Sequence, residues 1–350
     1  MTPHQTTYLR SHQQELAEKS VEQQYQRQPE LWQPYNERGR QISIRDTVYH
    51  LTYLAEAIEA DDPLLFGEYL AWVNVLFANL NFPDHVLPTT LACIRQVLTE
   101  ELPTAEKEVT LKMLDAGSQS MSKASLTLPS FIEGDGPLDR LARQFLDTVR
   151  RGDRRTAGQM IMDAVRDGTS VKTIYIQVFQ RTQREIGRLW QTNQVGVAEE
   201  HFCTAATQMI MSQLYPYIFT GERKDRRAVI ACVGGELHEI GARMVADFLE
   251  MSGWDTYFLG ANTPPHSILQ TVIEHKADVL ALSATMTFHV SEVTSIISSL
   301  RAETGLTTRV LVGGYPFNLS PDLWRKVGAD GYALDAETAV IAADKVIAVR

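Results

Sequence analysis

The stretch that decides the fold of the C-terminal third is residues 228–241, AVIACVGGELHEIG. Its first six residues form a short apolar run, which is typical of a strand buried on both faces of a parallel sheet. Two glycines follow, then an acidic residue, a histidine and the start of a helical pattern. Ligands of parallel sheets bind in the loops after the strands, so His238 is a candidate ligand-binding residue.

Strand and helix patterns alternate from this run to the C-terminus. The predicted strands are 228–233, 255–258, 279–282, 309–312 and a short one near Tyr332. The predicted helices are 239–251, 266–275, 290–301, 321–327 and one from residue 337. Five strands that alternate with helices predict a doubly wound, parallel, Rossmann-like (flavodoxin-like) domain over residues 226–350.

The sequence before this domain is helical. Four amphipathic segments joined by short polar turns, at 137–150, 155–167, 171–191 and 197–219, predict a four-helix bundle over residues 137–222. Residues 126–136 are rich in Gly, Ser and Pro and are expected to be a linker. Residues 1–125 are predicted to be a helical sensor or interaction domain, so the fold class is α/β plus all-α.

Composition excludes several function classes. The formal net charge of −10 argues against nucleic-acid binding, so no DNA partner is expected. The three cysteines form no CxxC pair, which argues against a disulfide framework and a zinc site and favours a cytoplasmic protein. No apolar run is long enough to span a bilayer, so no membrane association is expected.

Three short motifs lie at the ends of predicted strands. Taken alone, His238 is better interpreted as a solvated residue at a helix start, because a lone HxxG is a weak signal. The spacing changes this: 41 residues separate Gly241 from Ser283-x-Thr285, and 27 more precede Gly313-Gly314. The pattern Glu236-x-His238-x-x-Gly241, S-x-T, GG resembles that of the cobalamin-binding domain family.

The resemblance implies a role for each motif residue. His238 would replace the cofactor's own base as the lower axial ligand of cobalt, with Glu236 bonded to its other nitrogen, although Glu239 competes for that role. The remaining residues would surround the nucleotide tail and the corrin ring: Ser283 and Thr285 bonding the tail, Gly313 and Gly314 leaving it space, and Leu237, Gly241 and Gly260 near the ring.

A second spacing lies in the bundle. Trp190, nine further residues and then Glu200-His201 resemble the adenosyl-binding motif of cobalamin photoreceptors. The resemblance implies that Trp190 shields the upper face of the ring and that the Glu-His pair contacts the adenosyl group. The alternative is that Trp190 belongs to the core and the pair to a solvated face. Gln191 departs from the family, which has a histidine there that binds cobalt after illumination.

The N-terminal helices are dense in aromatic residues. Such a stripe is usually core or a dimer face. The order of domains, without a winged helix, also resembles photocobilins, which hold biliverdin beside cobalamin. On that hypothesis His50, His85, Tyr69 and Trp72 contact the bilin.

Together these features predict a photoreceptor and not an enzyme. Adenosylcobalamin would cap the site in the dark, light would cleave the cobalt–carbon bond, and a homo-oligomer would change its assembly toward an unknown protein partner. The first alternative is a corrinoid carrier for methyl transfer. The second is the small subunit of a mutase, which would need a partner chain. The other histidines, His289 among them, are interpreted as structural or solvated.

Overall fold

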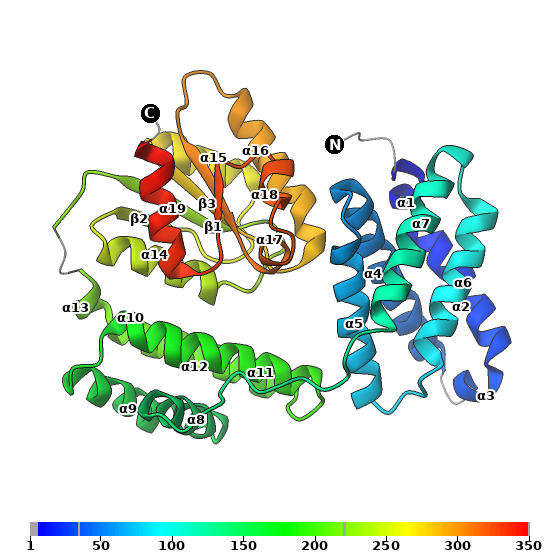
Figure 1. Ribbon diagram of the computed structural model, residues 1–350, viewed down its shortest axis with the longest axis horizontal. Helices are drawn as coiled ribbons and strands as arrows, with labels where there is room; N and C mark the ends of the chain where they lie inside the picture. Colours follow the sequence, from blue (N-terminus) through cyan, green and yellow to red (C-terminus); the bar gives the residue numbers. More distant parts are fainter. Residues whose placement is uncertain (1–5, 34–35, 220–221, 349–350) are drawn as a thin grey trace. The chain divides into compact units, whose positions relative to one another are not determined.

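The computed structural model describes residues 6–33, 36–219 and 222–348 (Figure 1). Its contacts divide the chain into two compact units. One unit is Met1–Leu126 with Leu319–Lys326, and the other is Thr127–Asn318 with Val327–Arg350. Within the described ranges, no helix has the length and apolar character needed to cross a bilayer.

The first unit is helical, as predicted. Its helices are α1 (Thr7–Ser11), α2 (Gln13–Arg27), α3 (Pro29–Trp32), α4 (Glu37–Ala60), α5 (Pro63–Asn79), α6 (Val86–Glu101) and α7 (Thr104–Met121). The break between α4 and α5 follows from the sequence. Asp61 has a left-handed backbone that ends α4, and the Asp62 carboxylate accepts a hydrogen bond from the Leu64 N–H at 3.0 Å. An acidic cap before Pro63 is a strong helix start.

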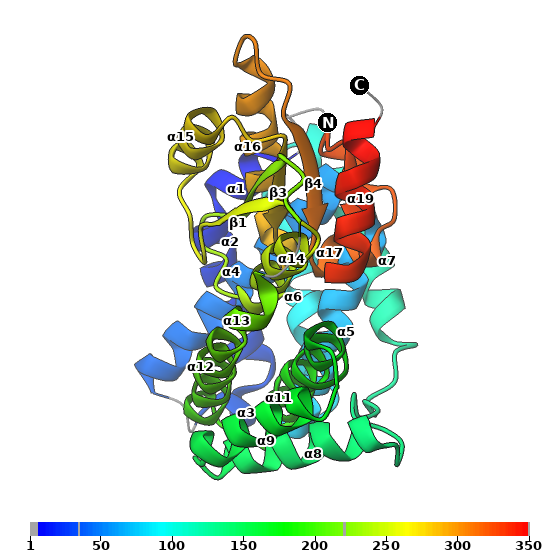
Figure 2. The same ribbon diagram turned by 90° about the vertical axis from the view of Figure 1, so that its left-hand side faces the viewer.

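The second unit begins with the bundle. Its helices are α8 (Pro137–Arg150), α9 (Arg154–Arg166), α10 (Val171–Ile174), the π-helical turn η1 (Tyr175–Gln180), α11 (Arg181–Gln191), α12 (Val197–Gln213) and α13 (Tyr215–Ile218). The segments α10, η1 and α11 follow one another without a gap, so the third predicted helix is one helix with a π turn inside it. Figure 2 shows α8, α9, α11 and α12 gathered below the sheet part of the same unit.

The predicted linker at 126–136 is packed and not free. Ile132 is buried in the bundle core. The Phe131 N–H donates to Glu185 at 2.8 Å, and the Phe131 carbonyl accepts from Arg181 at 2.9 Å. Its Gly, Ser and Pro content signalled a lack of regular secondary structure, which does not prevent packing.

The sheet confirms the predicted fold class. Its strands are β1 (Arg227–Cys232), β2 (Asp255–Phe258), β3 (Val279–Ser283), β4 (Arg309–Gly313) and β5 (Gly331–Ala333). All pairs are parallel, in the order β2-β1-β3-β4-β5. The connecting helices are α14 (Ile240–Met251), α15 (Pro265–His275), the 3-10 turn η2 (Thr287–His289), α16 (Val290–Ala302), α17 (Tyr315–Leu319), α18 (Leu323–Lys326) and α19 (Ala336–Ala348). This order reverses direction between β1 and β3, where ligands of such sheets bind.

The strand register brings the three motifs to one level. Cys232, the last residue of β1, pairs with Ser283 at the end of β3, and Ser283 pairs with Gly313 at the end of β4. The loops that carry His238, Thr285 and Gly314 therefore leave the same edge of the sheet side by side.

The bundle and the sheet part share a core. Ile240, Met244 and Phe248 of α14 belong to the same buried cluster as the bundle's apolar residues. The Tyr175 hydroxyl in the π turn also donates to the Asp247 carboxylate of α14 at 2.8 Å, in a buried position. The two segments predicted as separate domains thus form one compact unit.

Asp247 predicts a pH-dependent stability. Burial raises the pKa of Asp247 to about 6. Since this exceeds the unfolded value, the native state holds the proton more tightly, and stability falls as pH rises from about 4 to about 6. Asp247→Asn removes the buried charge and still accepts the Tyr175 hydrogen bond. We expect it to raise the free energy of unfolding by about 2 kcal/mol at pH 7.5 and much less at pH 4.5. Urea unfolding at both pH values measures this, and an equal effect at both would contradict it.

Candidate functional site

The loop after β1 presents His238 on a buried carboxylate. His238 Nδ1 lies 2.6 Å from Glu236 Oε1, and the His238 backbone N–H donates to the same oxygen at 2.9 Å. Glu236 is fully buried, whereas 61% of the His238 side chain is exposed. Because Nδ1 donates to the carboxylate, the neutral imidazole carries its free lone pair on Nε2, the nitrogen suited to bind a metal.

The second oxygen of Glu236 is held by the segment after β3. Oε2 accepts hydrogen bonds from the backbone N–H groups of Thr285 at 2.5 Å and Met286 at 3.3 Å, and it lies 3.1 Å from His289 Nδ1. The interpretation of His289 as structural or solvated did not include this contact. Its side chain is only 8% exposed, so this histidine is not solvated. Its place four residues after Thr285 was the available signal.

The charge of Glu236 is set by these donors. Burial on its own would raise the pKa of Glu236, but the hydrogen bonds from His238 and His289 and from the backbone N–H groups of His238 and Thr285 outweigh it and hold that pKa well below its usual range. The group is therefore a fixed carboxylate at neutral pH.

The carboxylate in turn favours a proton on His238. The hydrogen bond to Glu236 raises the pKa of His238, burial opposes it, and the charge of Glu200 in the bundle adds a smaller effect in the same direction as the hydrogen bond. A metal at His238 would have to compete with this proton.

Glu239, the competing carboxylate, has different partners. Its Oε1 accepts from Gln208 of α12 at 2.7 Å, and its Oε2 accepts from the Ala261 N–H at 3.0 Å. Gly260 has a positive φ of 79°, and a side chain there would approach Glu239. Glu239 therefore joins the bundle to the loop after β2, and the partner of the His238 imidazole is Glu236.

The three residues expected at the upper face of the corrin ring have different surroundings. Trp190, at the end of α11, is partly buried and packs on the bundle core. Glu200 accepts from Thr204 Oγ1 at 2.9 Å and lies 2.5 Å from His201 Nδ1, whose side chain is largely exposed. Of the three, Glu200 is the one whose charge reaches His238.

The remaining motif residues line the same edge of the sheet. Leu237 is largely exposed beside His238. A side chain at Gly241 would meet open space, and one at Gly313 would make ordinary contact with the Ala333 carbonyl at 3.4 Å. Gly314 differs, because it has a φ of 110° and a side chain there would overlap the Ala284 carbonyl. The backbone itself therefore requires this glycine, in addition to any space needed by a ligand.

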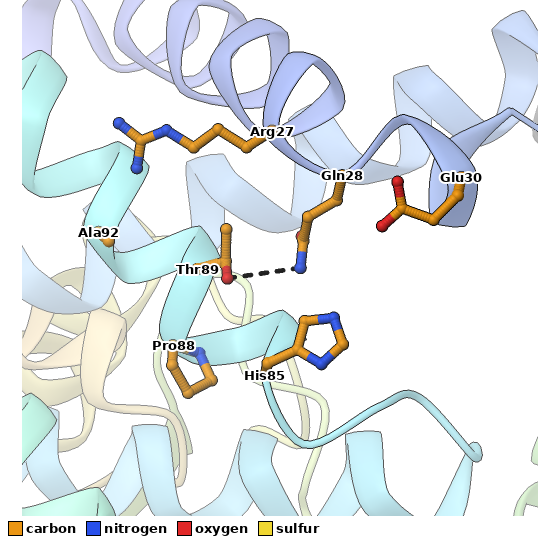
Figure 3. Close-up of a pocket in the computed structure, with 7 residues that line it drawn as sticks. All are labelled: Arg27, Gln28, Glu30, His85, Pro88, Thr89 and Ala92. Carbon is orange, nitrogen blue, oxygen red and sulfur yellow. Dashed lines mark hydrogen bonds between the residues drawn. The ribbon is translucent and has the colours of Figure 1, made fainter.

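Of the residues expected to contact a bilin, His85 lines a pocket whose lining does not include His50, Tyr69 or Trp72. His50 of α4 is buried, with Nδ1 2.8 Å from the Tyr69 hydroxyl of α5, and burial lowers its pKa to about 4. Trp72 is partly exposed on α5. His85 lies elsewhere, in an open pocket of about 530 Å³ lined by Arg27, Gln28, Glu30, Pro88, Thr89 and Ala92 (Figure 3).

A single histidine suits a metal that a macrocycle already holds. Within the described residues, no group of three or more His, Cys, Asp or Glu side chains is arranged to bind a bare metal ion. A bare ion needs several protein ligands, whereas a metal inside a macrocycle needs one axial ligand from the protein. The exposed imidazole with its second nitrogen fixed by Glu236 fits the second case.

Three family matches cover the chain. Residues 226–343 and residues 141–215 each match a family described as B12 binding domain. Residues 4–121 match the family described as phycobilisome protein. Apart from Leu319–Lys326, the two B12 matches lie in the second unit, and the third match lies in the first unit.

The relatives match about half of this chain and nearly all of their own length. The chain is 31% identical to dimethylamine corrinoid protein 3 of Methanosarcina mazei over 170 residues, which are 45% of this chain and 99% of that protein. It is 24% identical to a corrinoid protein of Desulfitobacterium hafniense, over 60% of this chain and 97% of that protein. The structure of the Methanosarcina barkeri monomethylamine corrinoid protein has the same fold, with a TM-score of 0.52 at 20% identity over 60% of this chain and 99% of that one.

These relatives contradict the predicted light-sensing function. Those from Methanosarcina are named as dimethylamine corrinoid proteins, which agrees with the methyl-carrier alternative and conflicts with a photoreceptor and its biliverdin chromophore. The W-x9-EH spacing misled because a tryptophan and a polar pair at one inter-helix turn also satisfy ordinary bundle packing, as Trp190 does here. Neither the adenosyl form nor a light-dependent oligomer is supported. The relatives are named as corrinoid proteins and not as methyltransferases, in agreement with a binding protein that is not itself an enzyme.

Proposed function

Because this chain belongs to the B12-binding domain family, we propose that it is a corrinoid carrier for methyl transfer, with His238 as the lower axial ligand of cobalt. The observation that carries the proposal is the His238–Glu236 pair at the end of β1, beside the end of β3. When bound, cobalamin supplies a cobalt atom that accepts a methyl group in its reduced state and gives it up to a nucleophile. The partner is a methyltransferase, which would perform the chemistry.

The chain's own residues would bind and orient the cofactor. His238 offers Nε2, and Glu236 fixes its tautomer and direction. Ser283 and Thr285, at the end of β3, and Gly313, at the end of β4, would meet the nucleotide tail at the aligned strand ends. Leu237, Gly241 and Gly260 would lie against the ring and its rim.

The bundle would cover the upper face. Helix α12 leaves apolar side chains exposed at Val197, Phe202 and Met209, and apolar surface of this kind suits a corrin ring. Trp190, Glu200 and His201 would lie in the same part of the bundle, over the upper face of the ring. Since α12 is attached to the sheet part through Gln208 and Glu239, a methyltransferase could reach the cobalt only if the cover moved.

Methylation of the bound cofactor tests the proposal. Protein reconstituted with hydroxocobalamin, desalted and reduced with titanium(III) citrate is expected to take up methyl groups from methyl iodide stoichiometrically. The absorption spectrum and mass spectrometry of the retained cofactor measure the uptake. A parallel sample receives adenosylcobalamin. A protein that retains the adenosyl form and shields reduced cobalt from methyl iodide would show that the carrier assignment is wrong.

A further inference from the structure

We propose that Glu200 of α12 sets the redox preference of the bound cofactor: its negative charge favours the oxidised or methylated cofactor over the reduced, electron-rich one. The inference rests on the proposed function, in which His238 binds cobalt and the bundle covers the upper face of the ring. Glu200 forms no bond to cobalt in this proposal and acts through its charge alone.

Helix α12 turns one face toward the loop that carries His238. Glu200, Thr204 and Gln208 are four residues apart, so their side chains lie on one face of the helix. Gln208 donates to Glu239 Oε1 at 2.7 Å, and Glu239 directly follows His238. Glu200 lies about 12 Å along the helix from this attachment, since each residue rises by about 1.5 Å. The face that is attached to the loop is therefore also the face that carries the Glu200 carboxylate.

The charge of Glu200 acts on His238. The hydrogen bond to Glu236 is the main reason that the pKa of His238 is raised, and the charge of Glu200 acts in the same direction. Interactions between exposed charges are largely screened beyond about 8–10 Å at physiological salt. Glu200 therefore lies close to the exposed imidazole, and a ring bound through His238 Nε2 would experience the same charge.

The Glu200 carboxylate is held by a hydrogen-bonded chain between α11 and α12. The Thr204 hydroxyl lies 2.9 Å from Glu200 Oε1 and 3.1 Å from Gln183 Oε1, and the Gln183 amide donates to the Thr207 hydroxyl at 2.9 Å. The other oxygen of Glu200 lies 2.5 Å from His201 Nδ1. These contacts fix the direction of the carboxylate relative to the bundle.

The neighbouring Glu199 is a natural comparison. Its side chain is 35% exposed, close to the 28% of Glu200, and both stand in the first turn of α12. The Glu199 Oε1 accepts a hydrogen bond from Arg150 of α8 at 2.6 Å, so its charge is paired with a guanidinium. Removing the charge of Glu199 therefore gives the same change in net charge as removing that of Glu200, at a different place.

A nearby negative charge favours the state in which cobalt is more positive. One electron from an external reductant converts cob(II)alamin to cob(I)alamin, and no bond to Glu200 forms or breaks in this step. The reduced state is therefore disfavoured while α12 covers the site, and moving the cover away removes this effect. Methyl loading is then favoured in the opened state, in which a partner methyltransferase has access.

Redox titration of the loaded protein tests the inference. Full-length protein and the variants Glu200→Gln, Glu200→Asp and Glu199→Gln are loaded with hydroxocobalamin, and absorption gives the ratio of cob(I)alamin to cob(II)alamin against electrode potential. At one potential we expect Glu200→Gln to raise this ratio about tenfold, the order of effect of one charge at an effective dielectric constant of about 20. A tenfold change equals about 59 mV for one electron. Glu200→Asp keeps the charge and Glu199→Gln removes a paired one, so both should match the unaltered protein.

The EPR spectrum of the cob(II)alamin form separates the effect of charge from a change of ligand. The splitting of the cobalt lines by a coordinated nitrogen should be the same in all four proteins. The inference is overturned by an unchanged ratio in Glu200→Gln, by an equal rise in Glu199→Gln or Glu200→Asp, or by a rise that accompanies loss of the nitrogen splitting.

Two further measurements separate this inference from the function on which it rests. If the unaltered protein takes up methyl groups from methyl iodide and His238→Ala loses the nitrogen splitting, while Glu200→Gln leaves the ratio unchanged, the carrier assignment stands and the role of Glu200 is wrong. If the protein retains no cobalamin, or His238→Ala keeps the splitting, the proposed ligation fails and the inference fails with it.

Discussion

Replacing His238 with alanine is expected to lower the affinity for hydroxocobalamin by at least about 100-fold, because it removes the axial ligand itself, whereas outer partners alone account for about 10–100-fold. The fold should survive, since the His238 side chain is mostly exposed and its loss creates no cavity. Titration of the apoprotein followed by absorption measures the affinity, and thermal unfolding of the apoprotein confirms that the variant is folded.

The matched control for His238→Ala is His266→Ala. His266 lies in the same unit, is also exposed, and has its Nε2 3.2 Å from the hydroxyl of its neighbour Ser267. Its loss should leave cobalamin affinity unchanged. If the two variants bind equally well, His238 does not hold the cobalt and the site must be sought elsewhere.

Replacing Gly314 with alanine is expected to destabilise the second unit by about 3 kcal/mol or more, without reference to any ligand. Its φ of 110° disfavours a side chain, and a Cβ atom there would overlap the carbonyl oxygen of Ala284. The Ala284 N–H donates a hydrogen bond to the Gly313 carbonyl at 3.1 Å. Moving Ala284 to relieve the overlap would therefore break this contact between the ends of β3 and β4. Urea unfolding followed by tryptophan fluorescence measures the loss.

Gly313→Ala provides the comparison. A side chain at Gly313 would make ordinary contact with the Ala333 carbonyl, so the free energy of unfolding should change little. If the nucleotide tail passes this residue, Gly313→Ala should weaken cobalamin binding in a stable protein. Equal stability of the two variants would mean that the backbone at Gly314 relaxes more easily than its geometry indicates.

Much of the fold and the central pair could be predicted from the sequence. The apolar run 228–233 indicated a buried parallel strand because few other elements bury both faces over so short a length. The Glu236–His238 contact is local, and the resemblance to cobalamin-binding domains implied it, with Glu239 left open as a competitor. Glu236 and His289 are 53 residues apart, and their contact depends on the register that pairs Cys232 with Ser283. Motif spacing alone does not contain that register.

The boundaries and the function were harder to predict, for two separate reasons. The shared core is made by Met244 and Phe248 of α14, which fit the pattern of an ordinary amphipathic helix whichever partner they face. The sequence therefore does not reveal that the bundle and the sheet are one unit. The function was misassigned through Trp190 and Glu200-His201, because their spacing is also compatible with ordinary bundle packing and does not specify a function.

The π turn at Tyr175–Gln180 has a consequence for the angular setting of the third bundle helix. Tyr175 faces α14, where it meets Asp247, and Trp190 lies further along the same helix, packed on the bundle core. Each residue of a helix rotates the following chain by about 100°, so the wider turn determines which way the distal end points relative to the proximal end. Deleting one residue to restore a regular helix would keep Tyr175 on α14 and swing Trp190 to a different side. The turn thus sets the rotation of the Trp190 end of this helix relative to the end that is bonded to α14.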